Sequence, residues 1–198
     1  MNMKYFKRFV QLGLVLMASQ FCLAQAAKST EKLPELPAKY AATAVGQAGS
    51  VAGKSFGLSV YVEGLTSTGE LEELAATLKN KGEDGLEKAM DDMKDKGRVS
   101  PVASTGTTMR VVRIRLRKDG GQRITLVTNR PISFAEVRNS SRSRDYRFAI
   151  VVLNVDKDGK GTGTFVPMCK IRFNKKKELE IENYGQEPFR LVNVYRQK

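Results

Sequence analysis

Three arginines at alternate positions near the middle of the chain are the residues best spaced to do chemistry. In the stretch Arg110–Lys118, apolar residues alternate with Arg113, Arg115 and Arg117. On a strand these arginines share one face, about 6.5–7 Å apart. Guanidinium groups at this spacing suit phosphate, sulfate or carboxylate groups, which they grip with paired hydrogen bonds. Arg123, beyond the turn Asp119-Gly120-Gly121, can join the same face from the partner strand.

A second group of arginines lies in the polar loop Asn139–Arg147, whose serines and tyrosine add donors for phosphate or sugar hydroxyls. The candidate anion face comprises Arg113, Arg115, Arg117, Arg123, Arg142 and Arg144. The alternative interpretation is a solvated face that stays charged so that the strand does not aggregate, with an ordinary polar loop beside it.

The chain contains no histidine, which removes the usual general base and the commonest metal ligand. No residue is therefore assigned as catalytic, and no cofactor is expected. The segment Asp156-x-Asp158-Gly159 resembles the start of a calcium loop, but Pro167 stands where the twelfth-position glutamate would be needed. We interpret it as a hairpin turn and assign no metal ligand. A hydrolase that uses carboxylates or a Ser/Lys pair stays open as the alternative.

Residues 1–26 have the layout of a secretory signal peptide. Lys4, Lys7 and Arg8 precede a short apolar run, and Ala24-Gln25-Ala26 provides a small-x-small cleavage pattern. The apolar run is shorter than the roughly 20 residues that span a bilayer. We therefore expect cleavage near Ala26, export to the periplasm or beyond the cell, and no integral membrane span in the mature chain.

The rest of the chain is expected to comprise a flexible Ala/Gly/Ser-rich linker, residues 27–55, and one α+β domain, residues 56–198. Ser67-x-x-Glu70 is a capping box that opens a helix ending at Gly82, and a second helix is expected over about Asp84–Lys96. From Met109 onward the apolar period is two. The fold class is therefore α+β, an antiparallel sheet or partly closed barrel of about seven strands with two helices N-terminal to most of it.

Cys169 is the one cysteine outside the expected signal, so no internal disulfide is available. It lies among apolar residues, which favours a buried, inert thiol. The formal net charge of +13 attracts anionic partners, and it does not distinguish nucleic acid, acidic polysaccharide and lipid headgroups. Weak binding to a polyanion or to the envelope surface is the partner hypothesis, and the oligomeric state is left open.

Four stretches carry a resemblance to a group of uncharacterised secreted bacterial proteins. They are Leu126–Phe134, Arg142–Tyr146, Gly159–Gly163 and Leu179–Gly185. The resemblance implies bacterial export and a compact β-rich domain, and it transfers no activity, cofactor or site residue. Together, the observations favour an exported, non-enzymatic binding or structural domain whose candidate ligand is an anion.

Overall fold

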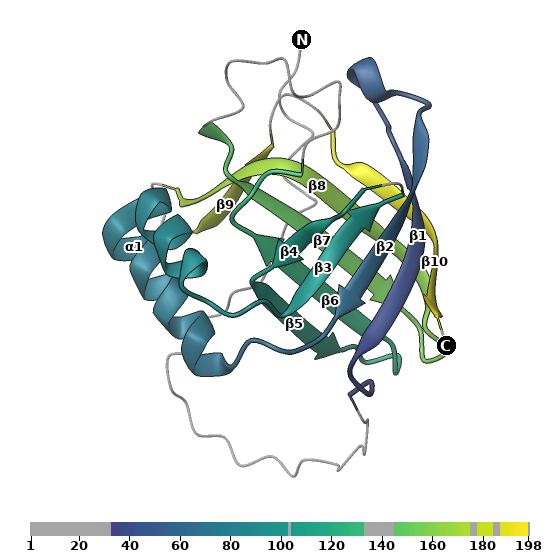
Figure 1. Ribbon diagram of the computed structural model, residues 1–198, viewed down its shortest axis with the longest axis horizontal. Helices are drawn as coiled ribbons and strands as arrows, with labels where there is room; N and C mark the ends of the chain where they lie inside the picture. The colour runs from purple at the N-terminus through teal and green to yellow at the C-terminus, as the bar shows by residue number, and fades with distance from the viewer. Residues whose placement is uncertain (1–32, 103, 133–144, 175–177, 184–186, 198) are drawn as a thin grey trace.

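The computed structural model describes residues 33–102, 104–132, 145–174, 178–183 and 187–197. They form a nearly closed antiparallel β-barrel with a helix against its outer wall (Figure 1). The strands are β1 (Ala38–Val45), β2 (Ser55–Val62), β3 (Gly97–Pro101), β4 (Thr107–Met109), β5 (Val111–Leu116), β6 (Gln122–Thr128), β7 (Phe148–Val155), β8 (Lys160–Phe173), β9 (Leu179–Asn183) and β10 (Phe189–Gln197). The helix is α1 (Thr68–Asp91), and a short 3-10 helix, η2 (Gly49–Val51), lies between β1 and β2.

The barrel wall follows the strand order β4-β3-β2-β1-β10-β8-β7-β6-β5, with antiparallel pairing throughout. The ring is nearly completed at Arg110, which joins β4 to β5 and whose N–H donates to the Val127 carbonyl oxygen (3.0 Å). At this residue the chain leaves β4, which pairs with β3, and enters β5, which pairs with β6. Outside this path, β9 pairs with the second half of β8.

The interior is filled by the inward-facing residues of each strand. In β1 the burial alternates residue by residue, with Ala38, Tyr40, Ala42 and Ala44 facing the core. Strand β7 is different, because apolar side chains cover both of its faces: one set packs inside the barrel, and the other packs with α1. This double burial explains the nearly continuous apolar run in its sequence.

The helix begins at the predicted capping box. The Ser67 hydroxyl accepts from the Glu70 N–H (3.2 Å), and the Glu70 carboxylate accepts from the Ser67 N–H (2.7 Å). The prediction of two separate helices is wrong as stated, because one helical element continues to Asp91. It is kinked at Gly82, whose backbone is left-handed (φ 66°). Glycine adopts this conformation without a steric penalty, so the chain turns there and resumes its helix.

The expected linker, residues 27–55, contains structured segments, so folded structure begins before Phe56. Strand β1 lies inside this range and pairs with both β2 and β10. The sequence does not reveal it because its inward positions are mostly alanine, which has weak strand preference and gives little apolar contrast.

The strand count is also higher than expected, because β3 and β4 were not predicted. The expected hairpin turns at Asp119–Gly121 and Asp156–Gly159 are confirmed by the pairing of β5 with β6 and of β7 with β8. Strand β3 contains a glycine and a proline, and β4 is three residues long. Glycine and proline are unfavourable in strands and hide β3, and β4 is too short to show a period of two.

Candidate anion-binding surface

The arginine hairpin β5–β6 places three guanidinium groups on the outer wall. Arg115 is directly opposite Arg123, and Arg113 is opposite Thr125. The flanking Val112, Ile124 and Leu126 face the core, so the arginines face outward. We call Arg113, Arg115 and Arg123 the arginine face.

Like charges directly opposite each other on paired strands are destabilising, because their β-carbons are only about 4.5–5.5 Å apart. Arg115 and Arg123 occupy such a pair. Partial burial lowers the pKa of Arg113, and the neighbouring charge of Arg115 lowers it further. An anion between these groups would offset the repulsion between the arginines and would stabilise the charged form of Arg113. The geometry is therefore suited to an anionic ligand.

The remaining predicted arginines do not all join this face. Arg117 forms an ion pair with Asp119 in the turn (2.6 Å), which neutralises its charge locally. Arg142 and Arg144 lie outside the described residues.

Charge is segregated between the barrel wall and the helix. Strands β1–β8 and β10 contain no aspartate or glutamate. Their basic residues are Lys39, Arg98, Arg113, Arg115, Arg123, Lys160, Lys170, Arg172, Arg190 and Arg196. Helix α1 carries seven acidic and three basic residues. Figure 1 shows this helix on one flank of the barrel, with β1 and β10 on the opposite flank.

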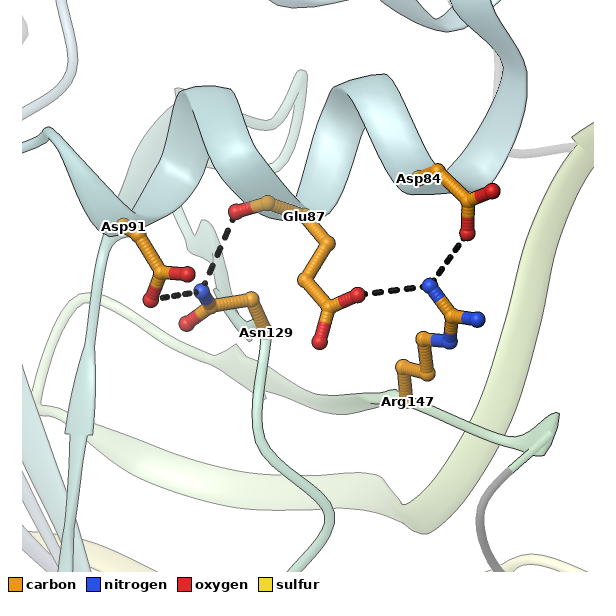
Figure 2. Close-up of polar contacts among 5 residues, drawn as sticks. All are labelled: Asp84, Glu87, Asp91, Asn129 and Arg147. Atoms are coloured by element: carbon orange, nitrogen blue, oxygen red, sulfur yellow. Dashed lines mark hydrogen bonds and ion pairs between the residues drawn. The ribbon is translucent and has the colours of Figure 1, made fainter.

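A polar network joins the second half of α1 to the barrel (Figure 2). One Arg147 nitrogen contacts the carboxylates of both Asp84 and Glu87, the latter at 2.7 Å. The Asn129 amide donates to the Glu87 carbonyl oxygen (3.2 Å) and to the Asp91 carboxylate (2.7 Å). These contacts satisfy Arg147 and fix the helix to the strand ends, so we assign the network a structural role. The sequence shows the acidic helix but not which distant residue it pairs with.

Glu83 is the carboxyl group with the most unusual environment. Burial raises its pKa, although the Ile171 backbone hydrogen bond and the cations Lys170, Arg147 and Arg172 oppose the shift. Its Oε1 atom is buried and has no hydrogen-bond partner among the described residues. A raised carboxyl pKa is what a general acid requires, but surrounding cations are typical of a structural carboxylate.

Cys169 is buried beneath the helix, as predicted. Burial strongly raises the pKa of its thiol, and the charge of Glu83 adds to the effect. A thiol in this state is a poor nucleophile, because the thiolate is the reactive form.

The β8–β9 hairpin carries a second set of satisfied charges. The Tyr146 hydroxyl donates to the Glu182 carboxylate (2.9 Å), and Arg172 pairs with the same carboxylate (2.8 Å). The Lys170 ammonium lies over the Tyr146 ring, 4.7 Å from its centroid. These mutual pairings leave the arginine face as the stronger candidate for an external anion.

The acidic turn between β7 and β8 is a hairpin turn. The Asp156 carboxylate accepts from the Asp158 and Lys160 N–H groups, both at 2.9 Å. Among the described residues, no group of three or more Cys, Asp or Glu side chains could hold a metal ion. In the same part of the chain, no helix combines the length and apolar character needed to cross a membrane.

Comparison with known proteins adds no family or neighbour: no family model, curated protein or solved structure matches this chain.

Proposed function

We propose that this protein is an exported, non-enzymatic binding protein that holds polyanions on the basic outer wall of its barrel. The observation that carries the proposal is the absence of carboxylates from nine strands of the described barrel, together with the arginine face on β5–β6. These nine strands contribute cations and no carboxylates to the wall.

The arginine face supplies the geometry for such binding. Two of its members are separated along β5 by one residue, and the third is directly opposite on β6. The backbone ladder fixes these positions, so the ordering cost of binding is confined to the side chains. Anionic groups a few ångströms apart on one polymer would meet several guanidinium groups at once.

The charge distribution favours binding with a defined orientation. The acidic helix is on a different flank from β1 and β10, which carry Lys39, Arg190 and Arg196. An anionic surface would therefore be repelled at the helix and attracted at these two strands. Long-range fields of this kind steer association and weaken with added salt.

One observation supports a binding role over hydrolysis. Asp84 and Glu87 share Arg147, so both carboxylates are engaged in ion pairs that hold the helix to the barrel. The N-terminal layout directs the protein outside the cytoplasm, where acidic polysaccharide and envelope phosphate are the abundant polyanions.

The test is elution from immobilised heparin along a salt gradient. Arg113→Gln, Arg115→Gln and Arg123→Gln are combined in one variant, with Lys79→Gln, Lys81→Gln and Lys88→Gln on α1 as the charge-matched control. We expect the arginine variant to elute at clearly lower salt than the control, because each lost phosphate-like contact reduces the salt slope. Equal elution of the two variants would contradict the proposal.

A further inference from the structure

A second basic surface lies on the β10–β1–β2–β3 side of the barrel and extends to the start of β8. We call it the tyrosine face, and it comprises Lys39, Tyr61, Arg98, Lys160 and Tyr195. All five belong to strands of the acid-free wall. The carboxylates nearest in sequence, among them Glu63, Asp95 and Asp158, lie beyond the strand ends.

Tyr61 stands between two cations on neighbouring strands. Its register partners are Lys39 on β1 and Arg98 on β3. The Lys39 ammonium lies over the tyrosine ring, 5.0 Å from the centroid, and Arg98 donates to the Thr105 carbonyl oxygen (3.2 Å). Tyr61 therefore helps to hold Lys39 in place, because the ring attracts the cation.

Tyr195 is the open aromatic group of this face. The residue is 46% exposed, the higher of the two values among the exposed large apolar residues Tyr195 and Leu116 of the barrel strands. Its register partners are Lys160 on β8 and Ala41 on β1, and Ala41 is in turn opposite Ser59. The ring therefore stands beside a lysine and above small neighbours, which leaves room for a flat group against it.

We propose that the tyrosine face binds an acidic polysaccharide, a chain of carboxylated sugar rings; this deepens the proposed function and rests on it. A sugar ring has an apolar C–H face, which matches the open ring of Tyr195. Its carboxylate would form an ion pair with Lys160, Lys39 or Arg98, and its hydroxyls would hydrogen-bond with Ser59 and the neighbouring Ser100.

Single-stranded nucleic acid fits this face less well. Proteins that hold such strands without sequence preference stack successive bases on several aromatic rings. Here Lys39 covers the ring of Tyr61, which leaves Tyr195 as the platform. Hydroxyl-bearing and small side chains between the two tyrosines suit sugar edges better than base planes.

The experiment compares binding of polygalacturonate, dextran sulfate and a thymidine oligonucleotide at one fixed ionic strength. The variant is Tyr195→Ala, and Leu116→Ala is the control, since Leu116 is a similarly exposed apolar residue on β5. Tyr195→Phe retains the ring. We expect Tyr195→Ala to weaken polygalacturonate binding about three- to tenfold, the range of one aromatic contact. Tyr195→Phe and Leu116→Ala should retain the wild-type affinity.

The outcomes separate this inference from the proposed function. Unchanged polygalacturonate affinity in Tyr195→Ala, with a loss in the arginine variant, overturns the tyrosine face and leaves polyanion binding intact. An equal loss for the oligonucleotide overturns the assignment to sugar and supports a nucleic-acid face. Wild-type protein that binds none of the three polymers overturns both proposals. Thermal melts of each variant establish that the fold is retained.

Discussion

The burial of Glu83 makes the free energy of unfolding depend on pH. The ordinary pKa of a glutamate here is 4.5, and burial raises that of Glu83. The folded chain therefore binds this proton more tightly than the unfolded chain. Stability contributed by the neutral carboxyl is fully present below pH 4.5 and is lost as the pH rises through the raised pKa.

Glu83→Gln should remove this loss, because glutamine resembles the neutral carboxyl in shape and does not ionise. We expect the variant to melt close to the wild type at pH 4 and above it at pH 8. Glu72→Gln, an exposed carboxylate on the same helix, serves as the control. A melting difference for Glu83→Gln that is the same at both pH values would contradict the burial argument.

Individual residues differed in how far their sequence context revealed their role. The outward placement of Arg113 and Arg115 follows from alternation alone, and the strand register agrees with it. The pairing of Arg117 with Asp119 depends on turn geometry, and that of Arg147 with Asp84 depends on tertiary packing. Neither pairing has a signal in local sequence.

At the scale of elements, the kink in α1 is the feature most open to test. Gly82 has φ 66° and ψ −159°, a region that is essentially restricted to glycine. A β-carbon at Gly82 or at Gly69 would point into open space, apart from the backbone of the helix itself. A substitution at either position therefore meets no clash, and only Gly82 carries a backbone penalty.

Gly82→Ala should lower the free energy of unfolding by about 1–3 kcal/mol, because alanine must adopt the strained backbone or straighten the helix. Gly69→Ala lies in regular helix and should be neutral or stabilising by up to about 1 kcal/mol. Urea denaturation of both variants measures the difference. If the two variants unfold at the same urea concentration, the kink is not maintained by the glycine.

Local sequence signals explain why some strands and hairpins were predictable and others were not. Hairpins with a glycine turn and strict alternation were found, since turn chemistry and period indicate the same structure. Strands β1, β3 and β4 were not found, because alanine-rich or very short strands acquire their stability from pairing with neighbouring strands. Pairing over long sequence separations leaves no local pattern.

At the scale of the whole molecule, β10 holds the wall together. It lies between β1 and β8 and pairs with both. Its inward residues Phe189, Leu191 and Val194 belong to the barrel core. Removing it would break the ring and expose two strand edges at once.

A chain that ends at Pro188 should therefore show no cooperative thermal transition by circular dichroism, whereas a chain lacking only Lys198 should melt like the wild type. A sharp transition in the shorter chain would show that the remaining strands close without β10.

The position of β10 also sets the order of events during synthesis. This strand emerges from the ribosome after every other strand of the wall, and β1, which emerges first, needs it as a partner. The growing chain cannot complete its ring until then, so the barrel stays open through most of translation. For the export that we propose, this order postpones closure of the barrel until the last strand has been made, and a chain that has not closed its barrel is easier to thread through a membrane translocation channel.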